Sequence, residues 1–216
     1  MRATEFLSEG NSTNLLIVDV QPEYASFSDR ILPGVQQMIV RATGKIVVVF
    51  NDFGGGDTPE QVLNYLAGVD PEDDGYYYND EEDDYYPRDA TPIEQKLQRA
   101  QFIQKEFGFL RPMMDQGISD RTIIQVIRLM YQHRVYDSRN IDFDALPNDI
   151  KQDIEQSNFD WDNEGIYTQE WIPVKLLKQL SPFYMMGGGR NECLREIELI
   201  CNAFNIRFKR IDSLVY

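Results

Sequence analysis

Two short apolar runs near the start of the chain constrain its fold more than any other feature. Residues 14–20 and 45–50 are dominated by Leu, Ile and Val. Short continuous apolar runs of this kind are typical of strands buried on both faces of a sheet. A helix is predicted between them at 33–43, and Thr58 followed by Pro59 marks the start of another. This strand–helix–strand–helix order predicts an α/β fold with a mainly parallel sheet.

The middle of the chain interrupts this alternation. Residues 70–90 are acidic and rich in tyrosine, and we predict a loop there. The segment 91–157 has apolar residues at helical spacing and no strong strand, so we interpret it as a helical insertion in an α/β domain of residues 1–69 and 158–216. Helices are expected in the insertion at 91–107, 119–133 and 147–156. After it, helices are expected at 172–180 and 191–204, and strands at 182–187 and 206–211.

The charge of the chain limits the classes of partner that it can bind. Lys and Arg number 21 against 36 Asp and Glu, which gives a net charge of −15. Proteins that bind nucleic acid usually present a basic face, because phosphate contacts carry much of the affinity. We therefore expect neither nucleic acid nor an anionic membrane as a partner. No apolar run approaches the length of a membrane-spanning helix.

Histidine and cysteine usage bounds the chemistry. A single histidine, His133, excludes a multi-histidine zinc site, and we expect no metal and no cofactor. His133 follows an amphipathic helix and is predicted to lie at its exposed end. Cys193 and Cys201 lie eight residues apart in a predicted helix, too far apart to form a disulfide. Reduced thiols predict a cytoplasmic location.

The strongest candidate for chemistry is the segment from Gly187 to Cys193. Three glycines follow a predicted strand, so backbone amides can face a cavity, and Cys193 then falls in the first turn of a helix. The positive end of the helix dipole favours the thiolate there, and nearby amides could hold an oxyanion. Cys193 is therefore a candidate nucleophile. The alternative is a small apolar residue packed on the sheet beside a tight glycine turn.

A second candidate is Asp19, which ends the first apolar run. The carboxyl ends of parallel strands line the ligand crevice in open α/β sheets, so an acidic residue is well placed there. Asp19 and Cys193 would lie within about 6 Å of each other if their strands are neighbours and the side chains share a face. Alternatively, Asp19 only caps the turn that follows.

Together these segments resemble the isochorismatase-like cysteine hydrolases, which include the nicotinamidases. Residues 16–24 are similar to that family's first-strand motif, and 187–194 to its segment in which a cysteine opens a helix. The resemblance covers 13–69 and about 165–216. It implies a three-layer α/β sandwich, Asp19 as general base and Cys193 as nucleophile. It also implies a cis peptide at Gly188–Gly189 that completes an oxyanion hole with the Cys193 amide.

The candidate substrate-binding residues are Gln21, Asp52 and Arg190. The family's catalytic lysine has no counterpart at 161–167, and its metal-binding histidines are absent. An active site would therefore need another cation near Cys193. Arg190, Lys151 and Arg111 are the candidates, and a nitrogen of one of them should lie within about 5 Å of the sulfur or of the Asp19 carboxylate.

Two classes of function remain open on the sequence. The leading one is a divergent cysteine hydrolase that acts on a C–N bond of a small amide, with a small-molecule substrate. The alternative is a noncatalytic binding or structural module on the same fold, in which the helical insertion and the acidic, tyrosine-rich segment contact a protein partner or a second copy of the chain.

Overall fold

The computed structural model describes residues 12–51, 56–70, 76–79, 84–104 and 108–216. The chain forms two compact units. We call one of them the sheet unit, which comprises Met1–Lys105, Phe183–Gly188 and Lys209–Tyr216. The other is the helical unit, which comprises Glu106–Pro182 and Gly189–Phe208. Each unit is described by itself.

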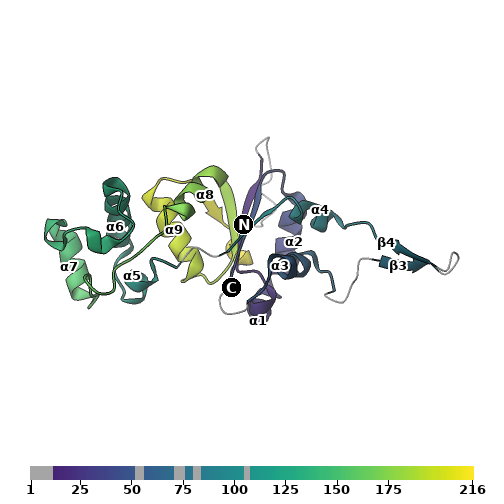
Figure 1. Cartoon of the computed structure of the whole chain (residues 1–216), viewed down its shortest axis with the longest axis horizontal. Coiled ribbons are helices and arrows are strands. Elements are labelled where there is room, and N and C mark those ends of the chain that lie inside the picture. Colours follow the sequence, from purple (N-terminus) through teal and green to yellow (C-terminus); the bar gives the residue numbers. More distant parts are fainter. Residues whose placement is uncertain (1–11, 52–55, 71–75, 80–83, 105–107) are drawn as a thin grey trace. The chain divides into compact units, whose positions relative to one another are not determined.

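Figure 1 shows the chain as a ribbon, with helices as coils and strands as arrows. A five-stranded sheet organises the fold, with the strand order β5-β2-β1-β6-β7. Its strands are β1 (Asn14–Val18), β2 (Ile46–Phe50), β5 (Gln101–Gln104), β6 (Phe183–Gly187) and β7 (Phe208–Arg210). β1 pairs in parallel with β2 on one side and with β6 on the other, and β2 pairs in parallel with β5. The predicted parallel pairing of the first strand with the strand near residue 185 is confirmed. The chain therefore has an α/β fold with a parallel sheet.

Helices of the sheet unit cover one side of these strands. They are α1 (Ala25–Ser28), α2 (Leu32–Arg41), α3 (Pro59–Ala67) and α4 (Pro92–Leu97), with a short 3-10 turn at Pro22–Tyr24. Leu15 and Ile17 of β1 join α2, α3 and α4 in one apolar core. Leu16 and Val18 alternate with them and are also fully buried, so β1 is buried on both faces, as its apolar run predicts.

The predicted start of α3 is confirmed in detail. Thr58 is its N-cap and accepts a hydrogen bond from the Gln61 amide, while the Gln61 side chain accepts one from the Thr58 amide. Pro59 occupies the first helical position, where a missing N–H costs nothing. Gly68 ends the helix in the left-handed region, with φ of 72°.

Two segments differ from the sequence prediction. A helix was expected over 91–107, but α4 ends at Leu97 and β5 then adds to the edge of β2. Phe102 and Ile103 favour a strand, and β2 offers them a partner that no local pattern reveals. The expected acidic loop contains the hairpin strands β3 (Tyr76–Asn79) and β4 (Asp84–Pro87), which pair antiparallel. Tyrosine has high strand propensity, which outweighed the acidic composition there.

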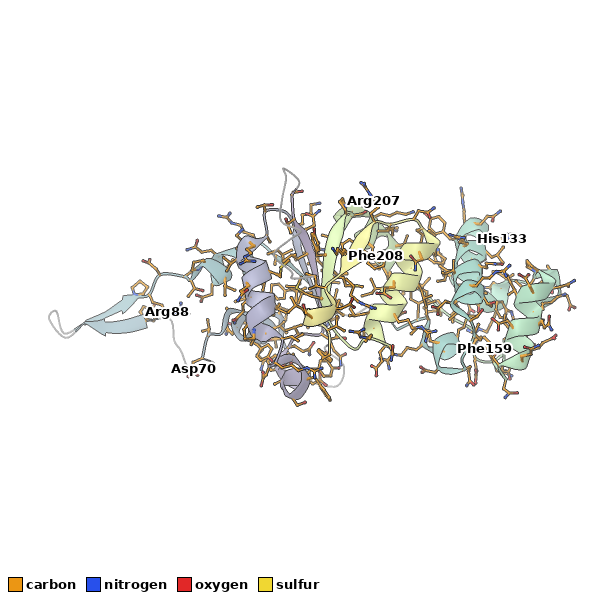
Figure 2. All side chains as sticks on the ribbon, turned by 180° about the vertical axis from the view of Figure 1, so that it is seen from behind. Asp70, Arg88, His133, Phe159, Arg207 and Phe208 are labelled. Atoms are coloured by element: carbon orange, nitrogen blue, oxygen red, sulfur yellow. The ribbon has the colours of Figure 1, made fainter. Side chains whose placement is uncertain are left out.

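Most helices of the helical unit lie close to the residue ranges predicted for them. Its helices are α5 (Arg111–Asp115), α6 (Asp120–His133), α7 (Asn148–Gln156), α8 (Ile172–Leu180) and α9 (Cys193–Ala203). α6 packs against α7 and α9, and α9 also packs against α8. His133 lies exposed at the end of α6, as expected (Figure 2). Among the described residues, no helix has both the length and the apolar character needed to cross a membrane.

Aromatic rings join three elements of the helical unit. Tyr131 of α6 contacts Trp171 and Phe204 edge-on, with ring centroids 5.3 and 4.8 Å away. The Lys178 ammonium of α8 lies 4.9 Å from the centre of the Tyr131 ring and 5.0 Å from that of Phe204. These contacts bring the end of α6, the start and end of α8 and the end of α9 together.

Candidate functional site

Cys193 is the first residue of α9, as the sequence predicts for a candidate nucleophile. The approach to the helix is a tight turn in which the amides of Glu192 and Leu194 both donate to the Gly189 carbonyl, at 3.2 and 3.3 Å. Cys193 is 4% exposed. Its sulfur therefore lies near the positive end of the α9 dipole, a position that favours a thiolate.

The second cysteine has a different environment. Cys201 is fully buried on the same helix, and neither it nor Cys193 forms a disulfide. Burial, together with the nearby Glu198 carboxylate, raises the pKa of the Cys201 thiol to about 12. A thiol of this kind stays protonated at neutral pH and does not react as a nucleophile. Cys201 therefore supports the core of the unit, and Cys193 is the candidate for chemistry.

Arg111 supplies a cation beside the Cys193 sulfur. Its Nη2 atom lies 3.8 Å from Cys193 Sγ and 3.0 Å from Glu192 Oε2. Burial acts to lower the pKa of Arg111, but its contacts with Cys193 and Glu192 raise it, and the net effect is a raised pKa. The predicted cationic nitrogen within about 5 Å of the sulfur is confirmed, and it comes from the helical insertion.

Most donors of Arg111 are unused. Within the residues that the structure describes, Nε and Nη1 of Arg111 have no hydrogen-bond partner, because both contacts of the guanidinium are made by Nη2. The Arg111 side chain is 43% exposed. Each of these N–H groups carries part of the positive charge of the guanidinium, so each can donate to an anionic group close to the sulfur.

A buried carboxylate that the sequence analysis did not single out connects Arg111 to α9. Glu196 is 1% exposed, and its Oε1 accepts a hydrogen bond from the Leu110 amide at 3.0 Å. Leu110 is the N-cap of α5 and immediately precedes Arg111. One signal could have found Glu196: it is an acidic residue among the buried positions of α9, between Cys193 and Ile197.

Asp19 belongs to the sheet unit and follows β1 directly. It is 2% exposed and has a φ of 53°, in the left-handed region that residues other than glycine rarely adopt. Its amide donates to the Val49 carbonyl, and its carbonyl accepts from the Tyr216 hydroxyl. A strained backbone of this kind persists only where surrounding contacts hold it. Because Cys193 belongs to the helical unit, the site shared by the two residues stays a prediction.

Gln21 follows β1, and its side chain forms hydrogen bonds with Asn51, which follows β2. It is fully buried, and its Oε1 accepts from the Asn51 amide at 2.8 Å. Its Nε2 donates to the Asn51 carbonyl and to Asp57 Oδ2, each at 3.0 Å. The side-chain amide therefore makes structural contacts within the sheet unit. A substrate contact of Gln21 stays a prediction.

The remaining candidates lie in three different settings. Gly188 is buried with φ of 58°, and its carbonyl accepts from the Tyr216 amide. Among the described residues, the one cis peptide bond joins Ser181 and Pro182, so the implied cis bond at Gly188–Gly189 is not found. The left-handed Gly188 makes the turn with a trans bond, which avoids the cost of a cis bond at a residue other than proline. Arg190 is exposed in the turn before α9, and Asp52 lies outside the described residues.

Comparisons with protein-family models, with curated proteins and with solved structures each find no match. Within the described residues, no group of three or more His, Cys, Asp and Glu side chains could hold a metal ion.

Proposed function

We propose that this protein is a divergent cysteine hydrolase that cleaves a C–N bond of a small amide, with Cys193 as its nucleophile. The observation that carries the proposal is the Arg111 guanidinium, 3.8 Å from the Cys193 sulfur at the start of α9. A cation and a helix N-terminus both stabilise a thiolate, which is the reactive form of cysteine. In this proposal Arg111 replaces the lysine that the isochorismatase-like family uses.

The reaction follows from the chemistry of a thiolate. The sulfur attacks the amide carbonyl carbon, a C–S bond forms, and the C–N bond breaks as the amine leaves with a proton. Water then hydrolyses the thioester to a carboxylate and restores the thiol. The first proton must be supplied by a group other than Arg111, because a guanidinium does not give up its proton in a protein. By resemblance, Asp19 is the residue that exchanges protons with the thiol and the leaving group.

The free donors of Arg111 favour a particular kind of substrate. A small amide that carries a carboxylate near the scissile carbonyl would accept a hydrogen bond from Nη1 or from Nε while the carbonyl carbon meets the sulfur. The isochorismatase-like resemblance belongs to this proposal, including a three-layer sandwich around the parallel sheet and an oxyanion hole formed with the amides of Gly189 and Cys193. Binding of the substrate carboxylate to Arg111 would speed the reaction mainly by orienting the carbonyl carbon towards the Cys193 sulfur.

Alkylation of the full chain tests the nucleophile directly. Iodoacetamide near neutral pH should modify Cys193, located by peptide mass mapping, and leave Cys201 unmodified. Cys193→Ala should abolish labelling, whereas Cys201→Ala is the matched control and should not change it. The positive charge of Arg111 should raise the rate of Cys193 alkylation by anionic iodoacetate relative to that by neutral iodoacetamide. Arg111→Met should remove this preference for iodoacetate. If Cys193 is no more reactive than a free thiol in a peptide, the proposal is wrong.

Activity is tested on small amides that carry a carboxylate, with release of the amine or of ammonia as the readout. Cys193→Ala and Asp19→Asn should each abolish turnover, and uncharged analogues of the same amides should be poorer substrates. Turnover that persists in Cys193→Ala would exclude this mechanism.

A noncatalytic binding module is the second candidate, and one observation favours it. The ion pair between Arg111 and Glu192 gives the guanidinium a structural role without any substrate. This candidate predicts an unreactive Cys193 and a protein complex that weakens steeply as salt is added, because the net charge of the chain is −15.

A further inference from the structure

We propose that Glu196 is a positioning residue, which holds the Arg111 guanidinium against the Cys193 sulfur. Its importance for hydrolysis rests on the proposed function, but the positioning itself does not. The inference starts from a chain of three contacts in the helical unit: Glu196 to the Leu110 amide, Leu110 to its neighbour Arg111 along the backbone, and Arg111 to Cys193.

The hydrogen bond between Glu196 and the Leu110 amide lies next to the backbone positions of Cys193 and Arg111. Glu196 is three residues after Cys193, so it sits in the first turn of α9. Leu110 is the N-cap of α5, and its amide donates to Glu196 Oε1 at 3.0 Å in a buried setting. A hydrogen bond from an amide to a carboxylate is stronger than one between neutral groups, and burial removes the competing water. The first turn of α5 is thereby fixed to the first turn of α9.

The other contacts of α5 do not fix the guanidinium as closely. The ion pair of Arg111 with Glu192 joins side chains that are 43% and 64% exposed, and exposed pairs of this kind hold a geometry weakly. α5 is only five residues long, too short to be stable by itself. Leu110 and Met113 bury their side chains, but apolar contacts have little directionality. The bond to Glu196 therefore supplies the orientation.

The chemical identity of Glu196 supports the same role. It is 1% exposed, and the same face of α9 also buries Cys193, Leu199 and Ile200. A buried carboxylate is costly, and an apolar residue would satisfy the packing of this face. The cost is partly offset by the amide bond and by the positive end of the α9 dipole. A carboxylate at this position serves the start of α5, which carries Arg111.

The test uses the full chain in a Cys201→Ala background and two alkylating reagents. The readout is the rate of modification of Cys193 by iodoacetate divided by its rate with iodoacetamide. Changes in the fraction of thiolate cancel in this ratio, so it reports the positive charge beside the sulfur. Arg111→Met should lower the ratio about fivefold, as expected for the loss of one charge close to the sulfur near a protein surface.

Three changes at Glu196 separate positioning from packing. Glu196→Met removes the acceptor, and Glu196→Asp withdraws it by one methylene. Both should lower the ratio towards that of Arg111→Met. Glu196→Gln keeps an acceptor oxygen and should leave the ratio within about twofold of the wild type. In an Arg111→Met background, Glu196→Met should cause no further fall, because a positioning residue acts only through the group that it positions.

Glu198→Ala, on the same helix, is the matched control and should leave the ratio unchanged. Should Glu196→Met fail to fold, Glu196→Asp keeps the charge and the polarity and still moves the acceptor. The proposal is overturned if Glu196→Asp folds and keeps the wild-type ratio, or if Glu196→Met lowers the ratio equally with and without Arg111. The expected ratios in a protein that hydrolyses no amide would refute the proposed function and leave the positioning role of Glu196 standing.

Discussion

Arg88 in the sheet unit and Arg111 in the helical unit both contact carboxylates, but they do so in different ways. Arg88 binds Glu94 with two nitrogens, at 2.9 and 2.7 Å, and the same carboxylate also accepts from the Thr91 amide at the start of α4. Arg111 uses one nitrogen for both of its contacts. The first arrangement closes a structural network, and the second leaves donors available.

This difference separates stability from reactivity. Closed networks of buried polar groups stabilise a fold only while every partner is present, so removing one partner is expensive. Exposed pairs contribute little to stability, so they can change their partners at low cost. We therefore expect substitutions in the sheet unit to lower the free energy of unfolding, and substitution of Arg111 to change the chemistry of Cys193 instead.

The largest effect on stability is expected at Gly187 of β6, which lies opposite Val18 of β1. A Cβ at this position would lie 2.2 Å from the Val18 carbonyl oxygen and 2.5 Å from a methyl carbon of Val20, and the residue has φ of 82°. Gly187→Ala should lower the free energy of unfolding by about 3 kcal/mol or more, measured by urea denaturation.

Gly189→Ala is the control for Gly187, because its Cβ would meet Glu192 at an ordinary 3.5 Å. A Gly187→Ala protein as stable as the wild type would show that β6 and β1 can move apart enough to accommodate the added methyl group.

A smaller loss is expected from Gln21→Leu. The change keeps the approximate size of the side chain but removes every hydrogen bond that it makes with Asn51 and Asp57. The free energy of unfolding should fall by about 2–3 kcal/mol, because the fully buried amide of Gln21 is lost and Asn51 and Asp57 each lose a hydrogen bond with it. Gln95→Leu, an exposed residue with one bond to a backbone carbonyl, should cost much less. An equal loss in the two variants would contradict a closed network around Gln21.

The Arg88–Glu94 pair predicts a dependence of stability on pH. The hydrogen bonds from Arg88, and to a smaller extent from Thr91, lower the pKa of Glu94 from 4.5 to about 2, although burial acts in the opposite direction. A lowered carboxyl pKa stabilises the folded state above the ordinary pKa, and this contribution is lost as the pH falls from about 4.5 towards 2.

At neutral pH, Glu94→Gln should therefore be about 1–2 kcal/mol less stable than the wild type, a figure reduced for the solvent that reaches Arg88. Urea denaturation at a series of pH values should show this gap closing below pH 4.5. In acid, the free energy of unfolding of Arg88→Met should likewise differ little from that of the wild type. A gap that stays constant down to pH 2.5 would mean that the pair does not set the pKa of Glu94.

The smallest effect on stability is expected from Arg111→Met, although it matters most for chemistry. The Arg111 side chain is 43% exposed and its ion pair involves a Glu192 side chain that is 64% exposed. The free energy of unfolding should change by less than about 0.5 kcal/mol. The iodoacetate-to-iodoacetamide ratio of Cys193 should nevertheless fall. A large loss of stability without a change in the ratio would reverse the comparison between the two arginines.

Local patterns predicted most of the elements, because burial and helix capping leave direct marks in the sequence. The apolar runs of β1 and β2, the cap of α3 and the position of Cys193 at the start of α9 are of this kind. β5 was missed because its strand forms only against β2, about fifty residues away in the chain. Arg111 was one of three cations considered, since spacing alone cannot show which side chain reaches the sulfur. Glu196 was missed because an isolated acidic residue in a helix usually faces solvent.

The pairing of β1 also determines when the sheet can be completed. β1 begins at Asn14, but its second neighbour, β6, begins only at Phe183. While the chain is being synthesised, β1 and β2 can pair early, and the other edge of β1 stays open until β6 has left the ribosome. Contacts so distant in sequence form slowly, and an open apolar edge can pair with other chains in the meantime. The central position of β1 thus makes the interval before β6 is synthesised the stage at which folding competes with aggregation.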